Sequence, residues 1–324
     1  MINCAVIGLG SMGRHHARNY FEIENANLVA VADIDESRKK IVKDYGCKFY
    51  KDYKEMLKKE KIDVVSIAVP TYLHKEVAID CIEKGINVLL EKPIADTVKN
   101  AKIIIDKVKE KKVKFMVGHV ERFNPAVKKL KEIVKNKELG EITTIMARRV
   151  GLFPPQIKDT NVIIDLAIHD IDIFNYLLED LPIQHHCLTG KALVTKREDY
   201  ADLLLKYKNG TNAMLQVNWV TPIKIRLLNI TGTKGYAELD YITQSLTLYK
   251  SNYSKEFGDF DEVVRFSKPD KIELGIENKE PLKEELIHFL ECVKENKEPD
   301  MKGEEALEAL RIAIDLLNSI KVNS

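Results

Sequence analysis

Three short stretches of the sequence hold residue types suited to binding and oxidising a small molecule. A glycine-rich turn runs from Gly8 to Gly13, Lys92 directly follows an apolar run, and Asp165 and His169 stand four residues apart. Glycine turns of this spacing bind phosphate groups, and a lysine or a histidine can hold or move a proton. These residues indicate proton and hydride transfer beside a bound dinucleotide.

The glycine-rich turn fits the pattern G-x-G-x-x-G, comes after an apolar strand and opens a helical pattern. Gly8 permits the tight turn, Gly10 lets a pyrophosphate approach the backbone, and Gly13 lets the helix pack close to the strand. Ser11 and Met12 complete the loop, whose exposed N–H groups and helix dipole favour an anion. A plain structural turn is the alternative for the glycines alone.

Asp33 adds a second dinucleotide signal, since it ends the second predicted strand 25 residues after Gly8. A carboxylate at that place accepts hydrogen bonds from an adenosine ribose and repels a 2′-phosphate. We therefore expect NAD rather than NADP. Arg38 lies five residues further on, close enough to the adenine region to leave dual use open.

Lys92 stands in Glu91-Lys92-Pro93, directly after the fifth apolar strand. This places it at the carboxyl edge of a parallel sheet, where such proteins bind ligands. A lysine there can hydrogen-bond a substrate oxygen and stabilise negative charge on it. The alternative is a surface lysine, the usual fate of one among 51 basic residues.

Asp165 and His169 share one face of a predicted helix because their spacing is i, i+4. A histidine can take a hydroxyl proton while hydride leaves, and a carboxylate can orient it. Helix capping and solvation are the alternative. A second alternative is a metal site formed by Asp165 and His169 together with His185 and His186. The spacing of these residues matches no ligand motif, so we expect no metal.

The elements that must position these residues predict an α/β protein of two domains. Over residues 1–120, short β-branched runs alternate with helical patterns, as in a doubly wound parallel sheet. This is the predicted NAD-binding Rossmann domain. The expected strands are 2–8, 28–33, a piece near 49, 64–68, 88–90 and 114–118, with helices at 12–21, 36–45, 52–59, 73–84 and 98–111.

Residues 121–324 form the predicted substrate-binding and oligomerisation domain, an α+β unit with a mostly antiparallel sheet. The Asn209-Gly210 turn between two alternating runs is a strong hairpin signal. A proline-containing loop is expected at 151–160. The expected strands are 200–207, 211–219, 225–231, 236–240 and 245–249, with helices at 125–137, 163–178, 281–295 and 304–320.

Composition excludes several classes of protein. The chain has 324 residues, 51 basic and 50 acidic ones, and this balance disfavours a nucleic-acid partner. No apolar run approaches the roughly 18 residues of a membrane span, and no basic leader precedes the first strand. Five scattered cysteines suit reduced thiols. We expect a cytoplasmic protein that binds neither nucleic acid nor membrane.

Taken in order, the motifs resemble the glucose–fructose oxidoreductase / inositol dehydrogenase / MocA-type (Gfo/Idh/MocA) family of sugar oxidoreductases. The resemblance extends over essentially the whole chain. It rests on the N-terminal glycine turn, the stretch Ala68 to His74, Glu91-Lys92-Pro93, and the Asp165–His169 pair.

The resemblance implies roles for several of these residues. Lys92 would be the catalytic lysine, with Asp165 and His169 completing a triad that also contacts substrate. Other residues would line the NAD site, namely Pro70, Thr71, His74, Glu91 and Lys92. The family's open sheet commonly mediates oligomerisation, which implies a homo-dimer or homo-tetramer.

The stretches that begin at Gly118, Arg148 and Asn218 resemble the branch that oxidises UDP-N-acetylglucosamine at the 3-hydroxyl. Arg122 and Arg149 are candidate substrate residues, with Arg148 beside them, because guanidinium binds phosphate bidentately. Surface ion pairs or packing are the alternative for each. The 3-keto product would suit a downstream aminotransferase.

Two other functions stay open. The same chemistry on a free polyol or aldose, such as myo-inositol, would need no nucleotide. A regulator that senses NAD and a sugar without turnover is the alternative from a different class, and it would not need Lys92.

Overall fold

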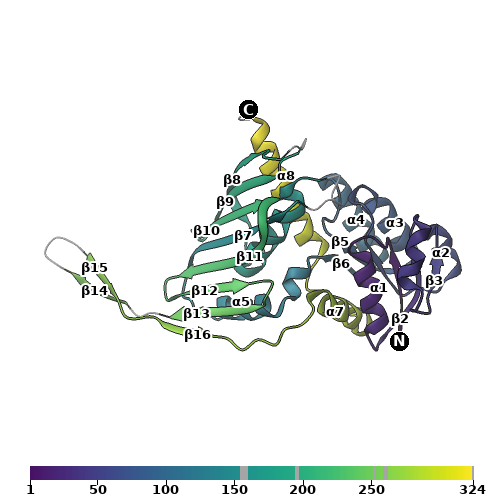
Figure 1. The fold of residues 1–324 in the computed structure, drawn as a ribbon, viewed down its shortest axis with the longest axis horizontal. Helices are drawn as coiled ribbons and strands as arrows, with labels where there is room; N and C mark the ends of the chain where they lie inside the picture. The colour runs from purple at the N-terminus through teal and green to yellow at the C-terminus, as the bar shows by residue number, and fades with distance from the viewer. Residues whose placement is uncertain (154–159, 194–196, 251–252, 258–261, 323–324) are drawn as a thin grey trace. The chain divides into compact units, whose positions relative to one another are not determined.

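The computed structural model describes residues 1–153, 160–193, 197–250, 253–257 and 262–322. It divides into two compact units: unit 1 comprises Met1–Phe123 and Lys279–Arg311, and unit 2 comprises Asn124–Asn278 and Ile312–Ser324. Figure 1 shows the elements of both. Most of the expected loop at 151–160 lies outside the described residues.

Unit 1 contains a six-stranded parallel sheet in the order β3-β2-β1-β4-β5-β6. This order confirms the predicted doubly wound Rossmann architecture. Its strands are β1 Ile2–Ile7, β2 Ala26–Ala32, β3 Lys48–Tyr50, β4 Val64–Ile67, β5 Asn87–Glu91 and β6 Phe115–Gly118. β4 and β6 are buried at every residue, as expected for a sheet with helices on both faces.

The helices of unit 1 follow the predicted pattern with one change of type. They are α1 Gly13–Glu22, α2 Tyr53–Lys59, α3 His74–Glu83, α4 Val98–Lys111, α7 Pro281–Glu295 and the first part of α8 Gly303–Val322. Three short 3₁₀ segments are η1 Glu36–Val42, η2 Thr71–Leu73 and η3 Val120–Phe123. The predicted helix at 36–45 is thus a 3₁₀ segment, capped by the Asp35 carboxylate at the Ser37 N–H.

The division of the chain differs from the predicted domains at its C-terminal part. The predicted boundary after residue 120 lies close to the observed one after Phe123, but residues 279–311 belong to unit 1 rather than to the second domain. The apolar face of α7, with Leu286 and Phe289, is buried, and α7 contacts α1 and η3. Burial of this face explains why α7 lies with the parallel sheet.

Unit 2 is built on an eight-stranded sheet in the order β16-β13-β12-β11-β7-β10-β9-β8. Only the β10–β7 pair is parallel, which confirms the predicted, mostly antiparallel sheet. Its strands are β7 Ile142–Leu152, β8 Pro182–Gly190, β9 Tyr200–Tyr207, β10 Asn212–Asn218, β11 Val220–Gly232, β12 Gly235–Asp240, β13 Ser245–Lys250 and β16 Asp270–Glu273. β14 Tyr253–Phe257 and β15 Glu262–Phe266 pair as a separate hairpin (Figure 1).

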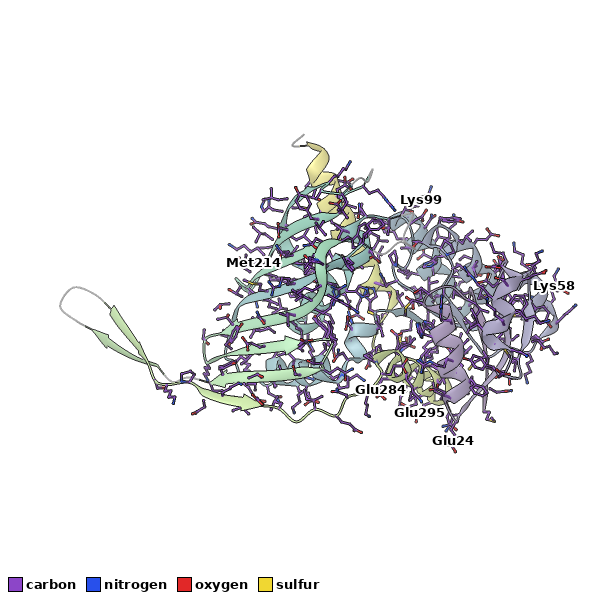
Figure 2. All side chains as sticks on the ribbon, viewed as in Figure 1. Glu24, Lys58, Lys99, Met214, Glu284 and Glu295 are labelled. Atoms are coloured by element: carbon purple, nitrogen blue, oxygen red, sulfur yellow. The ribbon has the colours of Figure 1, made fainter. Side chains whose placement is uncertain are left out.

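One face of this sheet is covered by helices and the other is open. Burial alternates strictly along β9 and β10, and α5 Pro125–Lys135 and α6 Ile168–Leu178 pack against each other in unit 2. The predicted hairpin turn joins β9 to β10, with Gly210 at φ +92°. Met214, labelled in Figure 2, is one of several half-exposed apolar side chains on the open face. None of the helices within the described ranges combines the length and apolarity that crossing a membrane requires.

Candidate active site

The glycine-rich turn between β1 and α1 has the close geometry of a phosphate loop. Gly8 has φ +89°, and a Cβ added to it would lie 2.6 Å from the Ala68 carbonyl oxygen. A Cβ on Gly13 would lie 1.7 Å from the Gly8 carbonyl oxygen, so the start of α1 packs directly on the turn. Around Gly10, the nearest described atom to an added Cβ is Arg38 Nη1, 3.8 Å away. The turn therefore leaves backbone open to an anion at the N-terminus of α1.

Asp33 lies beside this turn and is held by three donors. Its Oδ2 accepts the Leu9 N–H at 2.6 Å and Arg38 Nη1 at 2.7 Å, and its Oδ1 accepts the Asp35 N–H at 2.8 Å. The Asp33 side chain is buried, whereas Arg38 is 39% exposed. Because a carboxylate offers about four acceptor positions and Arg38 can move into solvent, Asp33 can accept ribose hydroxyls. These residues fit the adenosine half of NAD.

His74 lies beneath the loops that follow β4 and β5. Its Nδ1 is 2.9 Å from the Pro93 carbonyl oxygen and its Nε2 is 3.0 Å from that of Val69. The ring is 1% exposed, and burial lowers its pKa more than the two carbonyls raise it. A neutral ring donates to one of these carbonyls. Of the cofactor residues predicted here, Pro70 is exposed and Thr71 half-buried, so they are more accessible than His74.

Glu91 and Lys92 occupy adjacent positions with different environments. Glu91 is the last residue of β5 and 7% exposed, and its Oε2 accepts the Lys92 backbone N–H at 3.2 Å. Lys92 is half-buried, and the Lys92–Pro93 peptide bond is cis. β5 thus ends where expected and places Lys92 at the carboxyl edge of the parallel sheet. The Glu91 side chain is buried and lies 2.9 Å from His16 Nε2, and its role at the NAD site stays a prediction.

Asp165 and His169 lie in unit 2, on a helix that begins with a π-turn. Ile163–Ala167 is π-helical, with the Ile168 N–H donating to the Ile163 carbonyl, and α6 follows. The predicted α-helix over 163–178 is therefore wider in its first turn. This wide turn buries both Ile163 and Ala167 and leaves Asp165 half-buried, as His169 is. π-turns inside helices are frequent at functional sites.

Arg149 lies on β7 and is fully engaged inside unit 2. Its Nε is 2.5 Å from Asp170 Oδ2, its Nη2 is 3.2 Å from Asp170 Oδ1, and both side chains are buried. The Tyr241 hydroxyl also donates to Asp170, and the Tyr241 ring centroid lies 4.9 Å from the guanidinium carbon. Because Asp170 follows His169, this fork fixes the start of α6 on the sheet. The neighbouring Arg148 is exposed on the opposite face.

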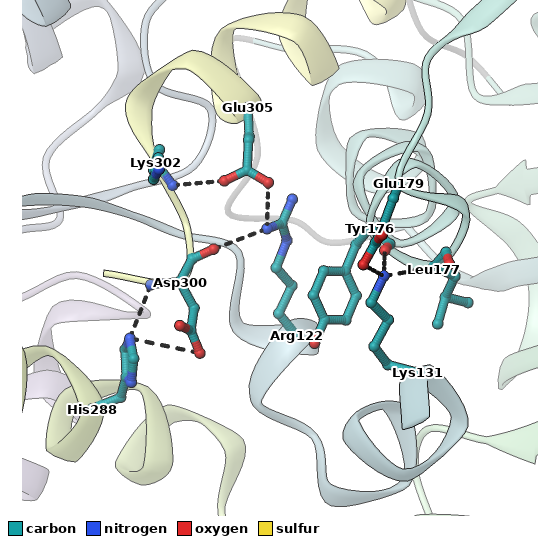
Figure 3. Close-up of polar contacts among 9 residues, drawn as sticks. All are labelled: Arg122, Lys131, Tyr176, Leu177, Glu179, His288, Asp300, Lys302 and Glu305. Carbon is teal, nitrogen blue, oxygen red and sulfur yellow. Dashed lines mark hydrogen bonds and ion pairs between the residues drawn. The ribbon is translucent and has the colours of Figure 1, made fainter. Parts of the chain in front are cut away.

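Arg122 is engaged inside unit 1 (Figure 3). Its Nη1 lies 3.2 Å from the Asp300 carbonyl oxygen and 2.9 Å from Glu305 Oε1. The Arg122 side chain is 4% exposed. It thus ties η3 to the start of α8. Figure 3 also draws the unit 2 contact of Lys131 with the Tyr176 carbonyl and Glu179.

The structure therefore collects the predicted residues in two groups. Unit 1 brings together the glycine turn, Asp33, Thr71, His74 and Lys92 along the carboxyl ends of its strands, and unit 2 holds Asp165 with His169. Arg122 and Arg149 have partners within their own units. In the described part of the chain, no group of three His, Cys, Asp or Glu side chains is arranged to hold a metal.

The sequence reasoning missed one buried histidine. His16 lies on α1, fully buried, with Nε2 2.9 Å from Glu91 Oε1. The available signal was its place on the buried face of an amphipathic helix three residues after Gly13, where the polar nitrogens of a buried ring need hydrogen-bond partners.

Comparisons with known proteins agree with the fold. Residues 2–119 match the model of the Gfo/Idh/MocA oxidoreductase family, NAD-binding Rossmann fold, and residues 127–238 match the Gfo/Idh/MocA C-terminal domain. UDP-N-acetylglucosamine 3-dehydrogenase of Acidithiobacillus ferrooxidans is 30% identical over 84% of this chain and 86% of its own. A solved structure of that enzyme has a TM-score of 0.85 at 26% identity, covering 97% and 96% of the two chains.

A second relative is named for a different substrate, an inositol. scyllo-Inositol 2-dehydrogenase (NAD(+)) of Bacillus subtilis is 29% identical over 99% of this chain and 94% of its own. A solved myo-inositol 2-dehydrogenase from Lactobacillus plantarum, 22% identical with a TM-score of 0.82 over 100% and 98% of the two chains, shares the fold.

The buried fork at Arg149 predicts how its variants behave. In Arg149→Lys, the charge is kept but the bidentate bond to Asp170 is lost, so we expect kcat to fall about tenfold or more because His169 is displaced. KM should change little, whether or not the substrate carries phosphates. Steady-state kinetics on the two substrate types, with thermal unfolding as a check on folding, measure this.

Arg148→Lys, on the opposite face of the same strand, is the matched control and should behave as the wild type. A rise in KM confined to phosphate-bearing substrates in Arg149→Lys would instead support the substrate-binding role that the sequence predicted.

Proposed function

Because the chain belongs to the Gfo/Idh/MocA oxidoreductase family, it is an NAD-dependent oxidoreductase acting on a CH–OH group of a sugar or polyol, and we propose that its substrate is UDP-N-acetylglucosamine. The hydroxyl oxidised is that on C3, and the product is the 3-keto sugar nucleotide. The observation that carries this proposal is the likeness to UDP-N-acetylglucosamine 3-dehydrogenase in both sequence and structure.

Three residues carry the proposed chemistry. Lys92 Nζ donates a hydrogen bond to the reacting oxygen and stabilises the negative charge that grows on it. The His169 imidazole accepts the hydroxyl proton, and the Asp165 carboxylate orients the substrate or the ring. Bound NAD supplies the hydride acceptor, C4 of its nicotinamide.

The glycine turn and the strand ends supply the proposed cofactor site. The backbone of Gly8 to Gly13, including Ser11 and Met12, binds the pyrophosphate, and Asp33 accepts the ribose hydroxyls in place of Arg38. The close packing of the turn and the position of Asp33 beside it support these roles. Pro70, Thr71 and Lys92 line the nicotinamide end.

A polyol or free aldose is the second candidate substrate. The observation that favours it is the engagement of Arg122 and Arg149 in buried pairs, since these were the expected partners of a diphosphate. A neutral polyol needs no such partner. The inositol dehydrogenase from Bacillus subtilis, at 29% identity, also supports it.

The proposal has a consequence for the reactions around it. A ketone beside a nitrogen-bearing carbon is a substrate for transamination, so we propose that an aminotransferase consumes the product. Removal of the ketone would also pull the oxidation forward.

NADH formation at 340 nm with four substrates tests the substrate. We expect kcat/KM for UDP-N-acetylglucosamine to exceed that for UDP-glucose, myo-inositol and glucose by at least about 100-fold, because a site that hydrogen-bonds the substrate discriminates strongly. A ketone trap removes product inhibition. Turnover confined to myo-inositol or glucose would overturn the proposal and favour the second candidate. Tight NAD binding without turnover of any of the four would favour a regulator.

Replacement of Lys92 tests the proposed chemistry. We expect Lys92→Ala to lower kcat by about 10²–10³-fold, because one hydrogen bond to the developing oxyanion is lost. The dissociation constant of NAD, measured by calorimetry, should change little. Lys99→Ala, an exposed lysine labelled in Figure 2, is the control. Wild-type turnover by Lys92→Ala would contradict the role of Lys92.

We also propose that the chain forms a homo-oligomer through the open face of the eight-stranded sheet. A depression of about 520 Å³ on this face is lined by the apolar side chains Met146, Leu188, Leu204 and Met214 among others, together with polar ones such as Arg148 and Asp202. Leu188 is 77% exposed and Leu204 50%. Apolar patches of this kind mark interaction surfaces.

Charge placed on that face should separate the subunits. We expect the wild type to sediment as a dimer or tetramer and Leu188→Lys/Leu204→Lys to sediment as a monomer, because the buried lysines would be desolvated without partners. Ile103→Lys, at an exposed apolar position of α4 in unit 1, serves as the control. Equal masses for wild type and double variant would exclude this face as the interface.

A further inference from the structure

Glu91 is a buried carboxylate that faces away from the open edge of the sheet. It is 7% exposed, and a Cβ added to Gly118, its partner on β6, would lie only 3.4 Å from the carboxyl group. Its two oxygens have separate donors: Oε1 lies 2.9 Å from His16 Nε2, and Oε2 accepts the Lys92 backbone N–H at 3.2 Å. The carboxylate thus connects α1 to the backbone of Lys92.

The hydrogen-bond partners of His16 determine which of its nitrogens carries the proton. A carboxylate only accepts, so Nε2 carries the hydrogen toward Glu91. On the other side, Nδ1 is 3.0 Å from Ser66 Oγ, and Ser66 Oγ is 2.8 Å from the Tyr20 hydroxyl. Ser66 Oγ therefore links the Tyr20 hydroxyl to the His16 ring, and each of these three side chains has a hydrogen-bond partner. Tyr20, Ser66 and His16 are all fully buried.

The charges around Glu91 favour its ionised form. Burial raises the pKa of Glu91, but the hydrogen bond from His16 and the positive charge of nearby Lys92 outweigh this and hold the pKa below its usual value. Glu285 on α7 also faces Glu91 and is buried, and burial raises its pKa far above its usual value. Burial thus disfavours the charged form of Glu285, whereas the contacts of Glu91 favour its charged form.

We propose that His16 is a positioning residue for the reaction. Through Glu91 it fixes the backbone of Lys92, and the backbone in turn sets the position of the lysine side chain. This inference rests on the proposed role of Lys92. His16 touches neither substrate nor cofactor in this role. The hydrogen bond from His16 fixes the orientation of the Glu91 carboxylate. In that orientation, Glu91 Oε2 accepts the Lys92 N–H.

Substitution of His16 tests the inference. In His16→Leu, Glu91 keeps its burial but loses the donor at Oε1, so we expect kcat to fall about tenfold or more, with the NAD dissociation constant nearly unchanged. His16→Gln, whose amide nitrogen can donate to Oε1, should recover part of that loss. His15→Leu, at the exposed neighbouring position on the same helix, is the matched control.

The pH dependence of kcat distinguishes a positioning role of His16 from a purely structural one, because a purely structural role would leave it unchanged. Loss of His16 removes the first cause that lowers the pKa of Glu91 and leaves burial, which raises it. Glu91 then takes up a proton at a higher pH. The acid limb of the kcat profile should therefore move upward by about one pH unit or more in His16→Leu, and back toward the wild type in His16→Gln. An unmoved acid limb would count against the inference.

A double-mutant cycle with Lys92 separates this inference from the proposed function. If His16 acts through Lys92, His16→Leu should produce no further loss of kcat in a Lys92→Ala background. A tenfold loss in both backgrounds would overturn the positioning role and leave the role of Lys92 intact. Wild-type kcat in Lys92→Ala alone would instead overturn the proposed function.

A double variant separates the positioning role from a general loss of stability. In His16→Leu/Glu91→Leu, both buried polar groups are replaced by apolar ones, so the unfolding midpoint in urea should return toward the wild-type value. kcat should stay low because the Lys92 N–H has lost its acceptor. Recovery of kcat together with stability would mean that the pair serves only the fold.

Discussion

The structure of unit 1 depends on one constraint: the carboxyl ends of parallel strands meet at a single edge of their sheet. The glycine turn follows β1, Asp33 follows β2, Thr71 comes after β4, and Lys92 comes after β5. Residues that are far apart in the sequence are thereby gathered at one edge of the sheet. The order β3-β2-β1-β4-β5-β6 places β1 beside β4, where the direction of the winding reverses and ligands bind.

Buried charge fixes backbone in each of the two units. Glu91, Arg122 and Arg149 are each almost inaccessible and each meets an opposite charge or a fixed donor. Leaving one of these groups without its partner would cost several kcal/mol, so the pairs restrict the backbone to the arrangement that satisfies them. Backbone beside a proposed catalytic side chain is fixed in this way at Lys92 and at His169.

Much of the fold could be predicted because local patterns and global structure agree. The alternation of β-branched runs with helical patterns gave the order of elements in unit 1, and the turn at Gly210 gave the β9–β10 hairpin. The predicted α7 at 281–295 was correct in its limits. Its placement with the first unit was not predictable from periodicity, because an apolar face does not specify which surface will cover it.

The candidate site was predictable in part for the same reason. Motif spacing predicts Lys92, Asp165 and His169 as site residues, and their roles stay predictions. The spacing did not indicate that Arg149 pairs with Asp170, because the alternation on β7 and the facing helix decide which of two adjacent arginines is buried. The π-turn at Ile163–Ala167 left no signal, because it has the same apolar spacing as an α-helix. His16 was missed because its partner Glu91 is 75 residues away.

Unit 1 is formed by two segments that are far apart in the sequence, and this affects the order in which the protein can fold during synthesis. Residues 1–123 leave the ribosome first, yet the helix that covers α1 lies within 279–311. At about 5–20 residues per second, the intervening segment takes roughly 8–30 s to appear. For that time the nascent parallel sheet lacks α7 and keeps apolar surface uncovered, while the antiparallel sheet of unit 2 can already be assembled. The cofactor-binding unit thus begins first but is completed only after the strands of unit 2 have been synthesised, so a chaperone that shields the early segment would act on α1 and its surroundings.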